Sequence, residues 1–282
     1  MQPRNRLSFE PFQALLDKQI SSFEDLPRDF YGRTTLILDG STISMPDTKE
    51  NAPHSDEASS QKGQAGFPLV RMMALLAFPV RLVLDIAYAP YSGKGSGERT
   101  LVMKLIEAIT GKGFLLLLDA GLYSFKLMYT ILQQGNDFIL KAPINATLKP
   151  VEYLPDGSYI AIIEGKIEDL DKPARKDGKK NWKKIKNKLR DIRFEIPGFR
   201  PVRLVTSILD PAVTAHEIIV HYHKRWDIEI TYDEIKTHQC ATLKGQAPTV
   251  LRSKRPDLVK QELIAMIIMY NAVRDEAGRY QT

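Results

Sequence analysis

Two aspartates each end an apolar segment that has the composition of a buried β-strand. Asp39 follows Thr34–Leu38 and precedes a glycine, and Asp119 follows Phe114–Leu118 with a glycine two positions later. Ligands and metal ions gather at strand ends of this kind in α/β sheets, because a carboxylate is costly to bury without a cation or a hydrogen-bond partner. Asp-Gly and Asp-x-Gly also start turns, so the pair indicates either a metal-binding site or two ordinary turns.

Four chemically active side chains lie on a later stretch that has the pattern of a helix. Spacings of 3, 4 and 7 positions separate Tyr222, Arg225, Glu229 and Lys236. At about 100° per residue, they fall within a stripe roughly 60° wide. Apolar residues border the stripe, so we expect it beside the packed side of the helix, with Trp226 most simply a buried packing residue. Stripes of this kind are also common as solvated salt-bridge ladders, and at this point both interpretations stay open.

Three further patterns do not define a site. Glu234–Lys236 has the E-x-K spacing of restriction-type nucleases, but it lies in a helical stretch and not on a strand close behind an aspartate. His216 and His223 are seven positions apart and no cysteine pair accompanies them, which argues against structural zinc. Gly93–Gly97 lacks the dinucleotide-binding spacing and the lysine of a phosphate-binding loop, so we expect a flexible turn there.

The positive charge of the chain is concentrated in one segment. Of the 282 residues, 43% are hydrophobic and 26% are charged, which is typical of a globular protein and excludes a wholly disordered or fibrous one. The net charge is +6, yet Asp171–Arg193 alone contains eleven basic and three acidic residues. The remainder is therefore slightly acidic, and the basic segment indicates a polyanionic partner.

Neither an oxidising compartment nor a membrane is indicated. Cys240 is the only cysteine, so no internal disulfide can form. The longest uncharged apolar run, Met72–Val80, has nine residues, whereas a membrane-spanning helix needs about twenty. We therefore expect a soluble, intracellular protein without a membrane partner.

The order of the expected elements is that of an α/β fold. The expected helices cover residues 9–23, 96–109, 124–134, 214–238 and 257–276, and the expected strands cover 34–40, 67–78, 80–89, 114–119 and 137–141. An RNase-H-like mixed sheet flanked by helices fits this order. A doubly wound parallel sheet fits less well, because residues 66–89 leave no room for a crossover helix.

Composition divides the chain into four parts. Residues 1–33 form an N-terminal helical extension, and residues 34–145 form the first part of the core, including a polar loop at 45–64. In residues 146–208, short β-like pieces alternate with prolines, glycines and the lysine-rich run, which predicts a basic, β-rich insertion with a small sheet of its own. Residues 209–282 supply the second, helical part of the core.

These motifs, taken in order, resemble the DDE transposases of insertion-sequence family four. The Tyr222, Arg225, Glu229 and Lys236 set meets the family's Y-R-E-K signature at all four positions and is the specific part of the resemblance. The other matching blocks are Leu38–Thr42 with Met45–Thr48, Leu118–Ser124 with Gly135–Ile139, and the helix that usually follows, Arg252–Ile268. Together the blocks cover roughly residues 34–275 and favour a catalytic role for Glu229 over a salt-bridge ladder.

The resemblance implies an RNase-H-like catalytic fold whose insertion lies between the second aspartate and the glutamate. It also implies that Asp39, Asp119 and Glu229 hold two Mg²⁺ ions, for which Mn²⁺ can substitute. Mg²⁺ prefers carboxylate oxygens and substrate phosphate, and two such ions activate the attacking oxygen and stabilise the leaving one in an in-line displacement at phosphorus. The implied activity is cut-and-paste transposition, in which strands are cleaved at the element ends, typically through a hairpin intermediate, and transferred into target DNA.

The implied partners are the DNA of the element ends, the target DNA and a second copy of the chain in a synaptic complex. Tyr222, Arg225 and Lys236 are expected to hold DNA phosphates, since arginine offers a planar fork and lysine a point charge. The lysine-rich run would contact the backbone without reading sequence. Trp226 and Trp182 are candidates to stack on an extruded base, although buried packing is the favoured role for Trp226. The lysines expected in this contact are Lys179, Lys180, Lys183, Lys184 and Lys186. The implied location is the cytoplasm of a prokaryote, in association with the nucleoid.

The length of the chain departs from the family pattern. Only 38 residues precede Asp39, and the chain stops soon after the helix that contains Arg274. We therefore expect a transposase shortened at the N-terminus and at the C-terminus, or a fragment of one. The alternative function is a truncated, non-catalytic DNA-binding fragment or an inhibitor of the full-length transposase. A housekeeping RNase-H-like nuclease is a third interpretation, against which the block from Tyr222 to Lys236 argues.

Overall fold

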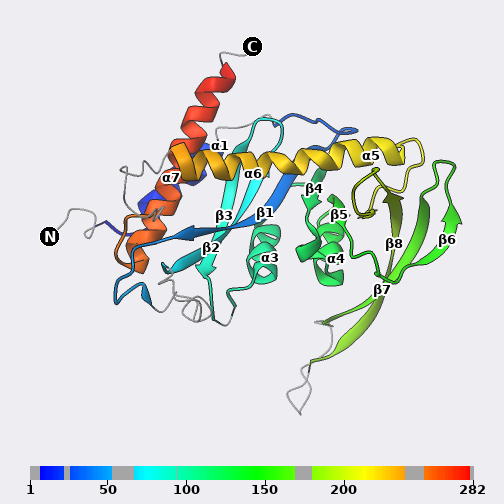
Figure 1. Ribbon diagram of the computed structural model, residues 1–282, viewed down its shortest axis with the longest axis horizontal. Coiled ribbons are helices and arrows are strands. Elements are labelled where there is room, and N and C mark those ends of the chain that lie inside the picture. The colour runs from blue at the N-terminus through cyan, green and yellow to red at the C-terminus, as the bar shows by residue number, and fades with distance from the viewer. Residues whose placement is uncertain are drawn as a thin grey trace. The chain divides into compact units, whose positions relative to one another are not determined.

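The chain forms two units, each with strands and helices of its own. The structure is a computed structural model that describes residues 7–21, 26–52, 67–93, 95–168, 180–238 and 251–279 (Figure 1). The first unit comprises Met1–Asp29, Leu36–Leu105 and Trp226–Thr282, and the second comprises Phe30–Thr35 and Ile106–Arg225. The four-part division expected from composition stays a prediction. Within the described ranges, no helix has both the length and the apolar content needed to cross a membrane.

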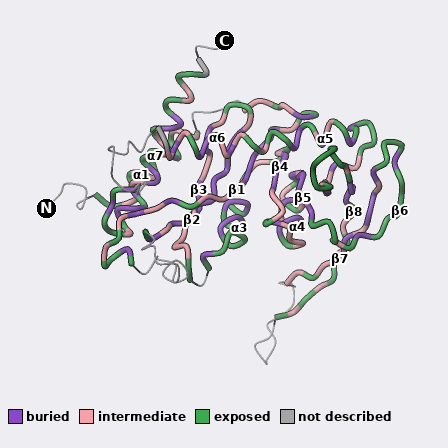
Figure 2. Tube along the Cα trace, viewed as in Figure 1, coloured by how far each residue is buried: buried purple, intermediate pink, exposed green. Residues whose placement is uncertain are grey.

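Three antiparallel strands organise the first unit. They are β1 (Thr34–Ser44), β2 (Leu69–Ala77) and β3 (Leu82–Pro90), with β2 paired to both of the others. The predicted hairpin is confirmed as β2 and β3. Most of β2 is buried (Figure 2), which is why its sequence is a nearly continuous apolar run and not an alternating one.

Strand β1 is longer than the sequence predicts. The expected strand ends at Gly40, but pairing with β2 continues through Gly40↔Met73 to Ser44↔Leu69. Ile43 is buried within this extension, and burial of such a residue against a neighbouring strand favours continued pairing. Asp39 therefore lies inside a long strand and not at a strand end, which corrects the prediction for this residue.

The first unit also contains helices, of which α7 (Pro256–Arg279) is joined to β3 by hydrogen bonds. The others are α1 (Glu10–Ser21), α3 (Glu98–Ala108), α6 (Asp227–Asp233) and the π-helical turn η5 (Glu234–His238). The Asn271 side chain of α7 accepts from the Val83 amide at 2.9 Å and donates to the Val83 carbonyl at 2.8 Å. Because both backbone groups of one β3 residue are satisfied by one buried amide, α7 has a defined position against the sheet.

A six-stranded mixed sheet forms the second unit, in the order β4-β5-β9-β8-β7-β6. Only the β4–β5 pair is parallel. The strands are β4 (Phe114–Leu118), β5 (Asp137–Lys141), β6 (Lys149–Tyr153), β7 (Tyr159–Glu168), β8 (Trp182–Phe194) and β9 (Val202–Thr206). Its helical elements are η3 (Ala120–Leu122), α4 (Phe125–Gln133), α5 (Ala215–Tyr222) and the turn η4 (His223–Trp226) that follows α5.

The insertion does not form a sheet of its own, which corrects the prediction. Strand β9 pairs with β5 through Ile139↔Thr206 to Lys141↔Leu204, so the strands of the insertion extend the sheet of β4 and β5. An unpaired edge on β5 would expose a row of backbone donors and acceptors, and β9 covers it. The lysine-rich run is expected to separate strands, but its part from Trp182 onward lies in β8.

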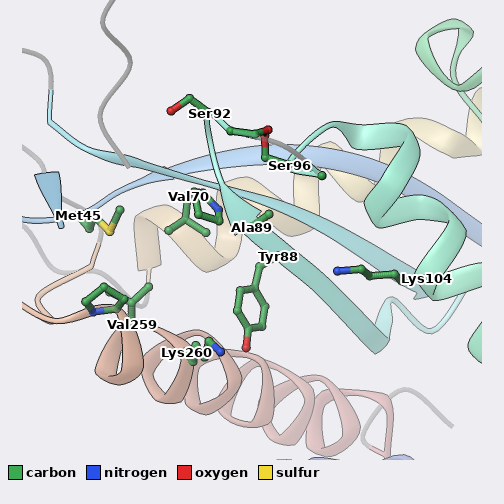
Figure 3. A pocket seen from close by; sticks show the side chains of 13 residues that line it. Met45, Val70, Tyr88, Ala89, Ser92, Ser96, Lys104, Val259 and Lys260 are labelled. Atoms are coloured by element: carbon green, nitrogen blue, oxygen red, sulfur yellow. The ribbon is translucent and has the colours of Figure 1, made fainter. Parts of the chain in front are cut away.

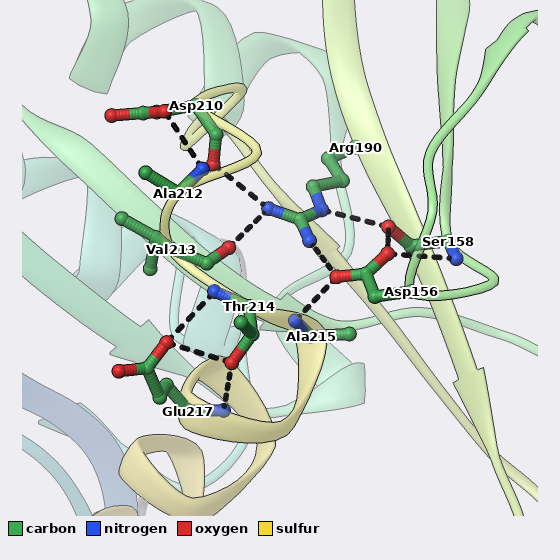
Figure 4. A network of polar contacts seen from close by, with 9 residues as sticks. All are labelled: Asp156, Ser158, Arg190, Asp210, Ala212, Val213, Thr214, Ala215 and Glu217. Carbon is green, nitrogen blue, oxygen red and sulfur yellow. Dashed lines mark hydrogen bonds and ion pairs between the residues drawn. The ribbon is translucent and has the colours of Figure 1, made fainter.

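The N-terminus of α5 is held by two carboxylates (Figure 4). Thr214 and Glu217 form a capping box, in which the Thr214 hydroxyl accepts from the Glu217 amide and the Glu217 carboxylate accepts from the Thr214 amide. Asp156, in the turn after β6, accepts from the Ala215 amide at 2.7 Å and also pairs with the fully buried Arg190. These contacts satisfy amides that a helix start would otherwise leave unpaired.

Glu217→Gln is expected to lower the melting temperature near pH 7, by an amount that shrinks as the pH falls. Hydrogen bonds from Tyr31 and Thr214 lower the pKa of Glu217 from 4.5 to about 2. A depressed pKa adds stability above the unfolded-state value and loses it as the pH falls through the folded-state value. The difference from wild type should therefore fade between about pH 4.5 and pH 2. Thermal melts across this range test it, with the exposed Glu107→Gln as control, and a difference independent of pH would contradict it.

Candidate active site

Asp39 lies on β1 with its main chain and side chain both hydrogen-bonded. The Gly40 amide donates to Asp39 Oδ1 at 2.7 Å, and the Tyr232 hydroxyl donates to the Asp39 carbonyl at 2.7 Å. The residue is only partly buried, and its carboxylate is held by the amide of the next residue. Such an arrangement positions a charged group without removing it from water.

The helical segment that carries Glu229 and Lys236 packs on the same strand. Tyr232 contacts Asp39, and Lys236 Nζ donates to Ser41 Oγ at 2.6 Å. Glu229 and Tyr232 are three positions apart within α6, and residues at this spacing are neighbours on a helix surface. Glu229 is partly exposed. Burial lowers the pKa of Lys236, although the negative charge of Asp233 acts to raise it. The structure therefore brings together the strand of Asp39 and the helix of Glu229.

Asp119 and two further signature residues belong to the second unit. Asp119 directly follows β4, as predicted, and precedes the turn η3, to which its partly exposed carboxylate makes no capping hydrogen bond. Tyr222 is 8% exposed, and its hydroxyl donates to the Leu118 carbonyl at 3.0 Å. Arg225 is partly exposed in η4.

The signature segment is helical, but it is not one regular α-helix. The 3₁₀ turn η4 and the π-helical turn η5 interrupt it, so a constant 100° per residue does not hold from Tyr222 to Lys236. Trp226 is 60% exposed, which shows that the prediction of a buried packing residue is wrong. The tighter turn changes the direction in which Trp226 projects. Glu234 forms an ion pair with Arg274. It lies in a helical turn and not on a strand, which agrees with the interpretation that Glu234–Lys236 is not a nuclease motif.

The chemistry of the predicted acidic residues suits a hard divalent cation. Carboxylate oxygens are the donors that Mg²⁺ prefers, and Asp39, Asp119 and Glu229 are each accessible to solvent in part. Within the part of the chain that the structure describes, no group of three or more His, Cys, Asp or Glu side chains is assembled as a metal site. The three carboxylates are therefore of the kind that binds Mg²⁺ or Mn²⁺, and the assignment of a metal site rests on this preference.

Three lysines of the described part of the lysine-rich run lie on one face of the ribbon that β8 forms with β7. Trp182, Lys184, Lys186 and Lys188 alternate with less exposed residues, so they share a face of the strand. Lys180 pairs with Glu168 at 2.6 Å and Lys186 pairs with Glu164 at 3.0 Å. Lys183 is partly exposed on the opposite face, and Lys179 lies outside the described residues. Arg190, which sequence analysis counts with this run, is fully buried and adds nothing to the basic surface.

A separate cavity of about 450 Å³ lies in the first unit. Its lining includes Met45, six positions after Asp39, and Val259 of α7, and none of the residues that line it is acidic. Figure 3 shows Tyr88 of β3 directed toward Lys260 of α7, whose ammonium lies 5.9 Å from the centre of the Tyr88 ring. The cavity is thus distinct in chemistry from the surroundings of Asp39.

Sequence analysis missed the residues that hold the main chain around the predicted acidic groups. Tyr232 is three positions after Glu229, so helical spacing alone could have placed it on the same face. No sequence signal identifies the backbone groups that its hydroxyl meets. No sequence signal identifies the ion pair of Asp156 and Arg190 either, because the two residues are 34 positions apart.

Comparisons with known proteins agree with these features. The family described as "Transposase DDE domain" matches residues 30–272. "Transposase InsG for insertion sequence element IS4" of Escherichia coli (strain K12) is 27% identical over 280 residues, which are 97% of this chain and 59% of that protein. "Putative transposase InsZ" of the same organism is 28% identical over 39% of this chain and 36% of its own length. The chain thus spans about three fifths of InsG.

Among solved structures, a piggyBac transposase chain in a synaptic complex with hairpin DNA has a TM-score of 0.51 at 12% identity. The match covers 85% of this chain and 46% of that one. The mixed sheet, its helices and this likeness define an RNase-H-like protein, which confirms the predicted fold. The chain belongs to the DDE transposase family, in the insertion-sequence family four group that its Y-R-E-K motif predicts. This is a family of phosphoryl-transfer enzymes whose members generally use divalent metal ions.

Proposed function

We propose that this chain carries the catalytic core of a transposase that cleaves DNA at the ends of an insertion sequence and joins the freed ends to target DNA. The observation that carries the proposal is the packing of the signature helix on the strand of the first aspartate, through Tyr232 to Asp39 and Lys236 to Ser41. A glutamate on that helix and an aspartate on that strand are the groups that the family motif requires. Asp119 would complete the set from the end of β4.

The proposed chemistry is an in-line displacement at phosphorus. Asp39, Asp119 and Glu229 would hold two divalent cations, whose charge would activate the attacking oxygen and stabilise the leaving one. Lys236 is bonded to Ser41, two positions after Asp39 on β1, and its ammonium would bind a phosphate of the reacting strand. Arg225 would hold a second phosphate through its planar fork. These residues bind and orient the DNA backbone.

The ribbon of β7 and β8 would add affinity without sequence readout. Its exposed face carries Lys184, Lys186 and Lys188 together with Trp182, which is 56% exposed. Lysines that neutralise phosphates give affinity that falls steeply with salt, and an exposed aromatic ring offers a surface on which a base can stack. This face alone also supports the second candidate function, DNA binding without cleavage. A homodimer in the synaptic complex belongs to the same proposal.

Incubation with DNA from the flanks of its own gene tests the proposal. We expect nicking that leaves a 3′-OH and joining to a second duplex, in Mg²⁺ or Mn²⁺ and not in excess chelator. A substrate already cut to expose the 3′-OH separates strand transfer from recognition of the element ends. Cleavage that persists in chelator would contradict the proposal. Salt-sensitive binding without any turnover on either substrate would favour the non-catalytic function.

A further inference from the structure

The Tyr232 hydroxyl bridges β1 and β2 at the position of Asp39. Asp39 and Ala74 stand opposite each other in the antiparallel register. The phenol oxygen accepts from the Ala74 amide at 3.1 Å and donates to the Asp39 carbonyl at 2.7 Å. Opposite residues of an antiparallel pair alternate between hydrogen-bonded and non-hydrogen-bonded pairs, and here the Tyr232 hydroxyl from α6 links the two opposite backbones. Tyr232 is 5% exposed, so water cannot readily replace its hydroxyl.

Tyr222 makes the equivalent contact in the second unit. Its hydroxyl donates to the carbonyl of Leu118, the last residue of β4, whose peptide bond leads into Asp119. The neighbouring His221 is hydrogen-bonded to Thr35 at 2.7 Å and stacks on Phe30 with ring centres 4.1 Å apart. A hydroxyl with one proton that is already donated to a carbonyl has none to give to a DNA phosphate.

We propose that these two tyrosines are positioning residues, each of which holds the main chain at a predicted metal-binding aspartate. Tyr232 fixes the peptide of Asp39, and Tyr222 fixes the peptide that precedes Asp119. For Tyr222 this role replaces the expected contact with a phosphate. The inference rests on the proposed function, because it assigns the tyrosines to the acidic residues that the reaction needs.

A positioning role matters because a metal site tolerates only small displacements of its ligands. A carboxylate must be held within about 0.5 Å of its productive position, and its main chain sets that position. Tyr232→Phe would remove one oxygen and leave the Ala74 amide and the Asp39 carbonyl without that buried partner. The ring itself, and hence the packing of α6 on the sheet, would be kept.

Tyr232→Phe and Tyr222→Phe are to be compared with wild type in three measurements. These are the Kd for end DNA, the strand-transfer rate at saturating DNA as a function of Mg²⁺, and Mn²⁺ binding by paramagnetic resonance without DNA. We expect the Kd for DNA to stay within about twofold, while the rate falls by about 10–100-fold and metal binding weakens by a similar factor, as for other residues that orient metal ligands. Tyr88→Phe is the matched control, a partly buried tyrosine on β3 of the same sheet, and should match wild type.

Other outcomes would overturn the inference. Weaker DNA binding and a reduced salt dependence in Tyr222→Phe, with an unchanged rate at saturating DNA, would make Tyr222 a phosphate contact. Wild-type metal binding and rate in Tyr232→Phe would remove its positioning role. If wild-type protein transfers no strands at all, the proposed function fails, but Mn²⁺ binding still tests the positioning role. Melting temperatures identify a variant that has not folded, and each tyrosine tests the inference separately in its own unit.

Discussion

Asp39→Asn is expected to lower the rates of DNA cleavage and strand transfer by roughly 10³-fold. A bound metal ion contributes several kcal/mol to the transition state, and each 1.4 kcal/mol is about a tenfold change in rate. Asparagine keeps an oxygen that can accept the 2.7 Å bond from the Gly40 amide, so the local backbone contact is retained. The substitution therefore removes the negative charge and leaves the shape of β1. Rates measured on pre-cut DNA in Mg²⁺ provide the test.

Asp85 offers a closely matched control on β3 of the same sheet. Its Oδ1 accepts from the following amide, that of Ile86, at 2.7 Å, as Asp39 does from Gly40. Asp85→Asn should leave the rate unchanged, because burial already raises the pKa of Asp85 and no signature residue contacts it among the described hydrogen bonds. Glu229→Gln and Asp119→Asn should repeat the loss seen with Asp39→Asn. Equal rates in Asp39→Asn and wild type would remove Asp39 from the catalytic set.

The sequence predicts well those elements whose structure is determined by one segment or by two that are close along the chain. The β2–β3 hairpin follows from two apolar runs that Pro79 separates. Strand β4 follows from a wholly apolar pentapeptide, and its burial agrees with the prediction of a buried strand. The helical signature segment follows from periodicity and from the cap at Thr214. In each case the interactions that select the element are short in range.

Features that depend on a distant partner could not be predicted in the same way. Strand β9 finds β5 across more than sixty residues, and β1 extends past Asp39 only because residues 69–73 lie alongside it. The hydroxyl of Tyr232 meets two backbone groups that no pattern identifies. Trp226 was misplaced for a different reason, since a 3₁₀ turn changes the angle per residue that the prediction assumed constant.

A buried ion pair in the second unit leads to the second large predicted effect, a loss of stability. Asp191 and Arg203 form an ion pair whose side chains are 0% and 1% exposed, and the Arg203 Nε donates to Asp191 at 2.8 Å. The Tyr159 hydroxyl donates to the same carboxylate oxygen at 2.9 Å. In the pairing of β8 with β9, Asp191 is opposite Val205 and Arg203 is opposite Arg193, so the ion pair joins the two strands diagonally within the sheet that continues to β5 and β4.

Asp191→Ala is therefore expected to lower the free energy of unfolding by about 3–5 kcal/mol, because it leaves the Arg203 guanidinium buried without its counter-charge. Urea unfolding measures this loss. Glu164→Ala is the control, since it breaks the exposed pair with Lys186 on the same ribbon and should cost nothing measurable. Replacing both buried partners, as in Asp191→Leu with Arg203→Met, should recover much of the loss, because no charge is then left unpaired. If Asp191→Ala is no less stable than Glu164→Ala, the buried pair does not hold β8 to β9.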